Sequence, residues 1–220
     1  MNFAEILMIF SEFVGTIAFA ISGATVAIRY RLDLFGVLFL GGVTALGGGT
    51  MRDLLLGQTP PRMFTNYFYL MLAAITAFGT FTVSYFARGY EMKNPQRLSN
   101  ALNIIDALGL GAFVVTGTSL AMTSGHEDNI FMCVFMGMMT GVGGGVLRDI
   151  MIHDIPAVLR KHIYAVAAII GGIVYYGIVR IFGNEAIATI ACVVLTVVIR
   201  ILASHYKWNL PRIKFTNEDF

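Results

Sequence analysis

Apolar residues along the chain gather into seven long runs, separated by short segments that hold most of the charged side chains. A helix needs about 20 mainly apolar residues to cross the hydrocarbon layer of a bilayer, and each run is close to that length. We therefore predict an all-α integral membrane protein with seven transmembrane helices. The predicted helices are 5–28, 35–57, 67–87, 102–123, 130–152, 162–182 and 185–203.

The composition favours a lipid bilayer as the environment of the chain. Hydrophobic residues make up 57% of the 220 residues and charged residues 13%, against roughly 25% charged in an ordinary soluble domain. The first run has no basic segment before it and no clear cleavage site, so we interpret it as a retained helix. The formal charge of +2 is too small to indicate a nucleic-acid partner. Cys133 and Cys192 fall in predicted helices, and we expect two buried hydrophobic residues there instead of a disulfide.

Lysines and arginines are distributed unevenly between the two ends of the predicted helices. Eleven fall after the first, third and fifth helices or toward the C-terminus, and the opposite face holds only Arg62 and Arg180. By the positive-inside rule the basic face is cytoplasmic. We expect a multi-pass protein of a bacterial or archaeal inner (plasma) membrane, with its N-terminus outside and its C-terminus in the cytoplasm. The eleven are Arg29, Arg31, Arg88, Lys93, Arg97, Arg160, Lys161, Arg200, Lys207, Arg212 and Lys214.

One unit of sequence occurs twice. The segments GGGTMRD at 47–53 and GGGVLRD at 143–149 share three glycines, an arginine and an aspartate, and a proline follows each copy, at Pro60 and Pro156. Upstream, EFVGTIAFAISG aligns with DALGLGAFVVTG. That alignment pairs Glu12 with Asp106, Gly15 with Gly109, Phe19 with Phe113, Ser22 with Thr116 and Gly23 with Gly117.

Each copy contains three predicted helices, an odd number, so the second copy must enter the membrane from the opposite side. Inverted repeats with a glycine-interrupted segment in each half indicate a transport pathway near the middle of the bilayer. We divide the chain into a first three-helix repeat at 1–90, a second, inverted repeat at 91–182, a seventh helix at 183–203 and a cytoplasmic tail at 204–220. A charged linker at 88–101, with Pro95, separates the repeats.

The glycine triplets fall near the middle of the second and fifth predicted helices. Each glycine lowers helix propensity by about 1 kcal/mol relative to alanine, so we expect both helices to kink or break there. Irregular backbone at membrane depth is tolerated only against protein or water, so a true break would imply a wet interior. The alternative is close packing of helices through small residues. The triplets are Gly47, Gly48, Gly49 and Gly143, Gly144, Gly145.

Arg52 and Arg148 lie within predicted helices, where a central arginine costs about 2.5 to 3.5 kcal/mol and usually faces a bundle interior or a water-filled cavity. Asp53 and Asp149 follow them directly. Neighbours on a helix point about 100° apart, so we expect each arginine to pair with a carboxylate of the other repeat. Such residues could form a structural salt bridge between the repeats, or line and gate a pore.

Four more residues complete the candidate pore or gate set. Glu12 and Asp106 lie near the start of the first helix of each repeat, where a carboxylate commonly reaches toward the membrane interface. Ser22 and Thr116 lie deeper, and a lone hydroxyl in a helix bonds to its own backbone by default.

Enzymatic chemistry has no support in the motifs. GGGTMRD is not GxGxxG, because Arg52 occupies the position of the last glycine, and no GxxxxGK[ST], HExxH or GxSxG occurs. His126 and His153 have no partner at metal-ligand spacing. We predict that the chain is not an enzyme and has no catalytic residue, metal site or cofactor.

These features together resemble the prokaryotic branch of the trimeric intracellular cation (TRIC) channels, a family also labelled bacterial glycine transporters. The resemblance rests on the paired GGGxxRD motif, the helix with serine or threonine and glycine ahead of each copy, the following proline and the helix count. It covers roughly residues 5–203. It implies a homotrimer with an hourglass-shaped pore in each protomer, flanked by the two glycine-broken helices. The permeant ion would be a monovalent cation, potassium or sodium and chiefly potassium, with Arg52 and Arg148 close to the constriction.

An arginine beside a cation pore repels the permeating ion, so its charge needs an explanation. Asp53, Asp149 or backbone carbonyls could neutralise it, or the arginine could act as a latch whose hydrogen bonds hold a closed state. We favour a latch with partial neutralisation. The rival function is a secondary transporter of glycine or another small amino acid, because an arginine is a natural carboxylate partner. A helix bundle without transport is disfavoured by the doubled intramembrane charges.

Overall fold

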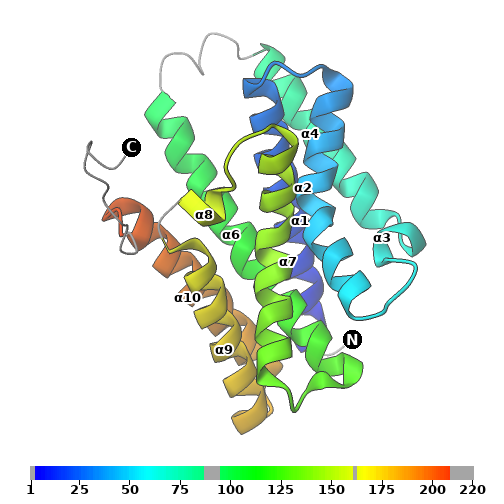
Figure 1. Cartoon of the computed structure of the whole chain (residues 1–220), viewed down its shortest axis with the longest axis vertical. Coiled ribbons are helices and arrows are strands. Elements are labelled where there is room, and N and C mark those ends of the chain that lie inside the picture. Colours follow the sequence, from blue (N-terminus) through cyan, green and yellow to red (C-terminus); the bar gives the residue numbers. More distant parts are fainter. Residues whose placement is uncertain (1–2, 87–94, 161–162, 209–220) are drawn as a thin grey trace, which may run out of the picture.

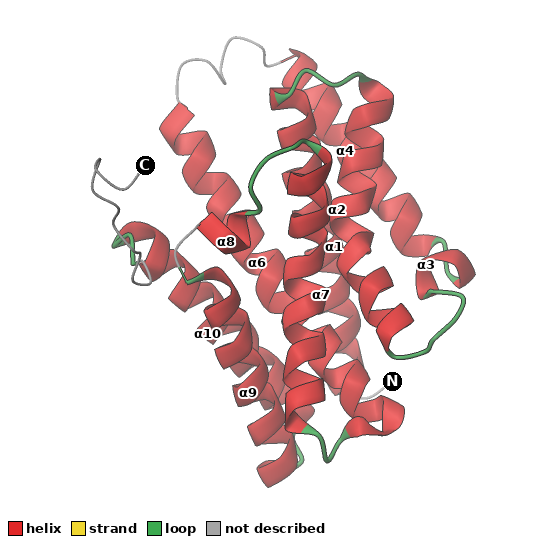
Figure 2. Cartoon of the chain, viewed as in Figure 1, coloured by secondary structure: helices red, strands yellow, loops and turns green. Residues whose placement is uncertain are grey.

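The computed structural model describes residues 3–86, 95–160 and 163–208, and within these ranges it holds helices and loops but no strand (Figures 1 and 2). Seven helices are long and apolar enough to cross a membrane, which confirms the predicted fold class. The elements are α1 (Phe3–Arg29), α2 (Leu34–Leu55), α3 (Arg62–Thr65), α4 (Phe68–Phe86), α6 (Pro95–Ala121), the π-helical turn η1 (Met122–His126), α7 (Ile130–Met151), α8 (Ala157–Arg160), α9 (Tyr164–Phe182) and α10 (Glu185–His205).

The fourth long helix begins earlier than its apolar pattern predicts. We expected a linker at 88–101, but α6 is helical from Pro95 onward; residues 87–94 lie outside the described part. Proline suits the first turn of a helix, where its missing N–H has no partner to lose. The polar residues that follow extend the helix beyond the apolar segment, and a hydropathy pattern detects only the part that matches the bilayer core.

The two repeats begin and end their second helices in the same way. Asp33 caps α2 by accepting the N–H of Gly36 at 2.8 Å, and Asn129 caps α7 by accepting the N–H of Met132 at 3.0 Å. One turn on, Phe35 stacks on Phe39 and Phe131 on Phe135, each pair with ring centroids 5.9 Å apart. After the helices, Gly57 and His153 both take left-handed backbone angles, with φ of 71° and 58°. The backbone symmetry is therefore kept even where the residue types differ.

Each repeat folds as a bundle of three long helices, and the two bundles meet through their first and second helices. Helices α1, α2 and α4 pack together, as do α6, α7 and α9. Contacts of α1 with α6 and of α2 with α7 join the bundles, and α10 packs against α6 and α9. Figure 1 shows α2 and α7 side by side in the middle of the molecule, with α4 at one edge and α9 and α10 at the other.

The predicted break at the glycine triplets is wrong for this structure. Helices α2 and α7 are continuous from their caps to their last turns. A Cβ on Gly48 would collide with the backbone carbonyl of Thr140, and a Cβ on Gly144 with that of Thr44. The glycines let α2 and α7 cross backbone to backbone, so close helix packing replaces the expected kink. The opposite helix covers the bare backbone, which offsets the low helix propensity of glycine.

Candidate functional site

Each intramembrane arginine pairs with the aspartate that follows it in sequence. Arg52 donates from Nε and Nη2 to Oδ1 of Asp53, at 3.0 and 2.7 Å. Arg148 donates from Nε to Oδ1 of Asp149 at 2.8 Å, and its Nη2 lies 2.8 Å from the same oxygen. All four residues are at most 7% exposed. The predicted pairing of each arginine with a carboxylate of the other repeat is therefore wrong.

A long arginine side chain can span the angle of about 100° that separates neighbours on a helix. Each guanidinium passes beside the third glycine of its triplet, at ordinary van der Waals distance from the place of a Cβ. A Cβ on Gly49 would lie 3.6 Å from Nη2 of Arg52, and a Cβ on Gly145 would lie 3.8 Å from Nη2 of Arg148. The guanidinium thus lies beside bare backbone and directs two neighbouring nitrogens at one oxygen of the carboxylate, which leaves the other oxygen free for a second partner.

The second oxygen of each aspartate holds the chain that returns toward the bundle. Oδ2 of Asp53 accepts the backbone N–H of Arg62 at 2.9 Å, and Oδ2 of Asp149 accepts that of Ala157 at 2.7 Å. The residue that aligns with Ala157 is Pro61, which has no N–H, so the bond moves to the next residue in the first repeat. Each aspartate therefore neutralises its arginine and also ties the helix end to α3 or α8.

Arg148 also reaches across to the other repeat. Its Nη1 donates to Oγ of Ser22 on α1, at 2.7 Å, and lies 3.9 Å from Oδ1 of Asp106. The remaining oxygen of Asp106 lies 3.9 Å from Nη2 of Arg200, on the unrepeated helix α10. Together they enclose a small pocket of about 90 Å³, which we call the Arg148 pocket. Its lining includes Ser22, Val26, Arg29, Asp106, Arg148, Tyr164 and Arg200.

The Arg148 pocket contains residues that the sequence analysis assigned elsewhere or missed. Arg200 was counted with the cytoplasmic basic residues, but it lies within α10 and is 4% exposed. Its guanidinium stacks on the ring of Tyr164, 4.3 Å from the centroid, and Tyr164 lines the pocket together with Asp106. An arginine inside the seventh apolar run was a signal of an interior role, by the same rule that identified Arg52 and Arg148.

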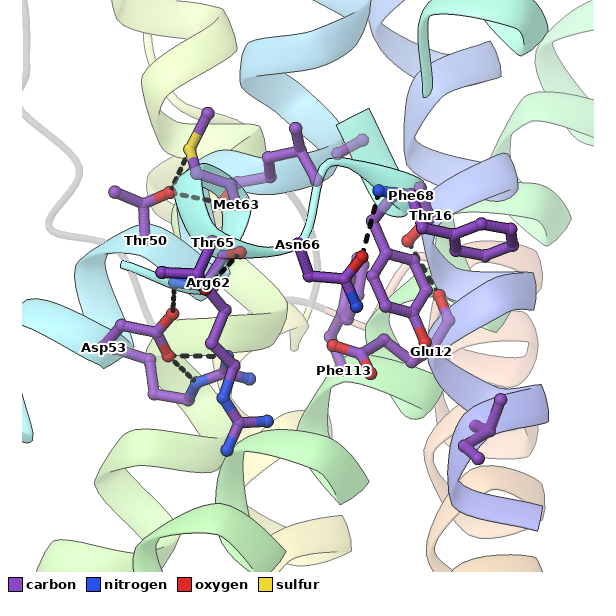
Figure 3. Close-up of a pocket in the computed structure, with 16 residues that line it drawn as sticks. Glu12, Thr16, Thr50, Asp53, Arg62, Met63, Thr65, Asn66, Phe68 and Phe113 are labelled. Carbon is purple, nitrogen blue, oxygen red and sulfur yellow. Dashed lines mark hydrogen bonds and ion pairs between the residues drawn. The ribbon is translucent and has the colours of Figure 1, made fainter. Parts of the chain in front are cut away.

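The counterpart around Arg52 is far wider. A cavity of about 560 Å³, which we call the Arg52 cavity, is lined by Glu12, Arg52, Asp53, Arg62 and Tyr69 among others, and Figure 3 shows how several of these side chains surround it. An adjoining cavity of about 480 Å³ shares Glu12, Arg52 and Arg62 and adds Thr116. Glu12 thus lines both of these cavities, and Tyr69 lines the first of them with it.

The two arginines differ in their links beyond their own aspartates. Among the residues that the structure describes, Arg52 has no ion pair with Glu12 and no hydrogen bond with Thr116, the counterparts of Asp106 and Ser22. Thr116 donates instead to the carbonyl of Phe113 in its own helix, at 3.2 Å. The same set of residues therefore occurs in a linked arrangement around Arg148 and in an unlinked one around Arg52.

The described residues contain no group of three or more His, Cys, Asp or Glu side chains placed to hold a metal ion. The buried carboxylates are used by arginines and backbone N–H groups, as described above. What this arrangement offers chemically is two polar cavities, each with an arginine that is paired to the aspartate beside it.

Comparison with known proteins places the chain among bacterial membrane proteins. A family model described as Glycine transporter matches residues 9–85 and 103–180. A UPF0126 membrane protein of Vibrio cholerae is 36% identical over 211 residues, covering 96% of this chain and 84% of that protein. The UPF0126 inner membrane protein YadS of Escherichia coli K12 is 39% identical over 207 residues, covering 93% of this chain and 95% of its own length.

Solved structures of TRIC channels have the same architecture. One TRIC cation channel is 39% identical, with a TM-score of 0.82 over 94% of this chain and 97% of that one. The TRIC orthologue of Rhodobacter sphaeroides is 32% identical, with a TM-score of 0.82 over 91% of this chain and 98% of that one. A TRIC channel of Caenorhabditis elegans, at 14% identity and a TM-score of 0.61, shares the fold alone.

Proposed function

Because the chain belongs to the prokaryotic TRIC channel family, whose family model carries the description Glycine transporter, we propose that it is a cation channel with a pore through each protomer. The permeant ions are monovalent, potassium above all. The observation that carries the proposal is the presence of two polar cavities, with matching residues, at opposite ends of one membrane-sized bundle.

Helix α1 connects the two cavities. It presents Glu12 and Thr16 to the Arg52 cavity and, further along, Ser22 and Arg29 to the Arg148 pocket. Helix α6 runs in the opposite direction and presents Asp106 to the Arg148 pocket and Phe113 to the Arg52 cavity. The route between the cavities therefore follows the inner faces of these helices, against the crossing of α2 and α7.

The arginines along this route are compatible with cation passage because their charges are paired. Arg52 makes two close contacts with the buried carboxylate of Asp53, and Arg148 makes two with that of Asp149. A neutralised pair presents a dipole to a passing ion in place of a net positive charge. Oxygens of Glu12, Thr16 and Asn66 in the Arg52 cavity can then replace part of an ion's hydration shell.

Arg148 acts in this proposal as a latch for the closed state. Its hydrogen bond to Ser22 joins the two repeats at the narrow end of the route, where the pocket has only about 90 Å³. Opening requires Arg148 to release Ser22 while it keeps Asp149, so the gating step breaks one charged hydrogen bond and leaves no carboxylate unpaired.

The membrane arrangement follows from the same premise. We place the Arg148 pocket toward the cytoplasm and the Arg52 cavity outside, since Arg29 and Arg31 lie at the Arg148 end of α1. A homotrimer in the inner membrane is the expected assembly. The outward face of α4 supports contact with lipid or with another protomer, because only Ala73 and Ala77 of that helix are buried.

A specific observation also favours a second candidate, transport of glycine or another small amino acid. Glu12 and Arg62 line the same cavity, where one could bind an ammonium group and the other a carboxylate. The cavity is large enough for such a solute. A transporter would expose this site alternately to each side of the membrane, which the inverted repeat also allows.

Single-channel recording of the purified protein in a planar bilayer separates the two functions. Under a potassium gradient, the proposal predicts discrete cation-selective current steps that do not change when glycine is added. A silent bilayer, together with saturable uptake of radiolabelled glycine into liposomes, would overturn the channel and favour the transporter.

A further inference from the structure

One face of α1 lines both cavities, and one position on that face lines neither of them. Ile9, Glu12 and Thr16 line the Arg52 cavity, and Ser22, Val26 and Arg29 line the Arg148 pocket. Their spacing of three or four residues marks one face of the helix. The position on this face between the two groups is Phe19.

Phe19 meets Phe113 of the other repeat at this level. Their ring centroids are 5.1 Å apart and the ring planes form an angle of 62°, an edge-to-face contact. Phe19 is 1% exposed and Phe113 6%, and Phe113 also lines the inner end of the Arg52 cavity. The two are counterparts in the repeat, so the pair lies where the symmetry-related halves of α1 and α6 meet.

A glycine on the opposite helix makes room for each ring. A Cβ on Gly15 would lie 3.1 Å from the Phe113 ring, and a Cβ on Gly109 would collide with Phe19. On the side of α7, a Cβ on Gly144 would lie 3.6 Å from Phe19. The rings therefore fill the space among α1, α6 and the crossing of α2 and α7.

Apolar side chains pack around this pair, and Ala45, Leu46 and Phe113 also form the apolar part of the lining of the Arg52 cavity. The buried side chains packed with Phe19 and Phe113 are those of Ala20, Ala45 and Ala73, with Leu46 at the edge. An apolar constriction between polar chambers stops ions because water does not fill it, and an ion cannot leave its hydration shell without replacement oxygens.

We propose that Phe19 and Phe113 form an apolar gate in the middle of the pathway, separate from the Arg148 latch. This inference rests on the proposed channel function. Conduction requires the two rings to part, and because one ring comes from each repeat, a relative movement of the repeats separates them. Fully open passage then needs both the latch released and the rings apart.

Two substitutions with the same number of side-chain heavy atoms, the same branching at Cγ and opposite polarity test the gate. Phe113→Leu keeps the constriction apolar, whereas Phe113→Asn brings a polar amide to the same place. We expect potassium flux into liposomes, per folded trimer, to be about tenfold higher for Phe113→Asn than for Phe113→Leu, as a barrier lower by about 1.4 kcal/mol would give. Phe19→Asn and Phe19→Leu should differ in the same direction.

Leu110→Asn on the same helix is the matched control, since Leu110 is fully buried in a separate cluster packed with α7. It places the same amide in the core away from the route, so it should lower the thermal midpoint without raising flux. Equal flux from folded Phe113→Asn and Phe113→Leu would overturn the gate and leave the ring pair as a packing contact.

Failure of the channel itself would give a different result. Wild-type protein and all variants would then pass no potassium, while wild-type protein would take up glycine saturably. Glycine uptake by the variants would then test the gate in the same liposomes. If Phe19 and Phe113 form the central barrier, Phe113→Asn should show a non-saturable glycine leak and Phe113→Leu should not. Absence of that leak would overturn the gate in a transporter as well.

Discussion

The two halves of this molecule carry the same residues in two different states. Around Arg148 the pocket has about 90 Å³, and the guanidinium bonds both to its own aspartate and to Ser22 of the other repeat. Around Arg52 the cavity has about 560 Å³, and the guanidinium holds its own aspartate only. Both halves contain the arginine–aspartate pair, and they differ in the hydrogen bond from the arginine to the other repeat.

In the proposed channel, this difference separates architecture from gating. The arginine–aspartate pair, the helix caps and the glycine crossing are the same in both repeats, so they serve the fold. The bond from Arg148 to Ser22 joins the two repeats and has no counterpart at Arg52 among the described residues, so it can be broken without disturbing the parts that the repeats share. The unrepeated helix α10 adds Arg200 to the narrow end, where it lies 3.9 Å from Asp106 and stacks on Tyr164.

The largest expected effect concerns a shared feature. Gly48→Ala and Gly144→Ala should each lower the stability of the detergent-solubilised protein by about 3 kcal/mol, because the added methyl group collides with a backbone carbonyl that cannot rotate away. Thermal unfolding measures both. Gly42→Ala on α2 is the control, since nothing lies within 4 Å of a Cβ there; equal midpoints for Gly42→Ala and Gly48→Ala would contradict the crossing.

Removal of the two arginines, one at a time, should have unequal effects on the ratio of open to closed channels. Arg148→Ala should raise the ratio of open to closed channels roughly 10- to 100-fold, as loss of a charged hydrogen bond of about 1.5 to 3 kcal/mol would give, with a smaller change in selectivity. Arg52→Ala should change the ratio much less. Single-channel recording measures both quantities. A reversal of cation selectivity, or the loss of folded trimer, in Arg148→Ala would count against the latch.

A gentler change isolates the bond between the repeats. Ser22→Ala removes the acceptor of Arg148 Nη1 but keeps the pair with Asp149, so open probability should rise about fivefold, equivalent to about 1 kcal/mol. Thr116→Ala is the matched change in the other repeat, and there we expect no effect on gating, because Thr116 bonds only to its own helix. Equal effects of the two substitutions would refute the assignment of the latch to one repeat.

The smallest effect compares the two helix ends. Gly57 and His153 share a left-handed backbone, which costs a residue with a Cβ about 1 kcal/mol. Gly57→Ala should therefore lower stability by about that amount and His153→Gly should raise it slightly, with no change in conduction. Chemical denaturation in mild detergent measures the two shifts, and shifts of the same sign would mean that the backbone angle is not their cause.

The sequence predicted the helices well because each apolar run reports directly on the thickness of the bilayer. The break predicted at the triplets was wrong because the helix propensity of glycine describes an isolated helix. In this structure the backbone of Thr140 covers Gly48 and that of Thr44 covers Gly144. The pairing of Arg52 with Asp53 does not follow from the helix angle alone, because the arginine side chain is long enough to reach a neighbour about 100° away. Arg200 could have been found from its place in an apolar run, but Tyr164 and Tyr69 are far in sequence from Asp106 and Glu12, and the fold alone brings them into the same cavities.

The most direct test of the account is side-specific cysteine labelling of the two ends of the route. Thr50→Cys lines the Arg52 cavity and Val26→Cys the Arg148 pocket, and native Cys133 and Cys192 are buried. With a membrane-impermeant methanethiosulfonate reagent, we predict rapid labelling of Thr50→Cys from outside and slow labelling of Val26→Cys from inside, which speeds up when Ser22→Ala is added. Equal labelling rates at the two ends, unaffected by Ser22→Ala, would contradict the central claim that one repeat is latched and the other is not.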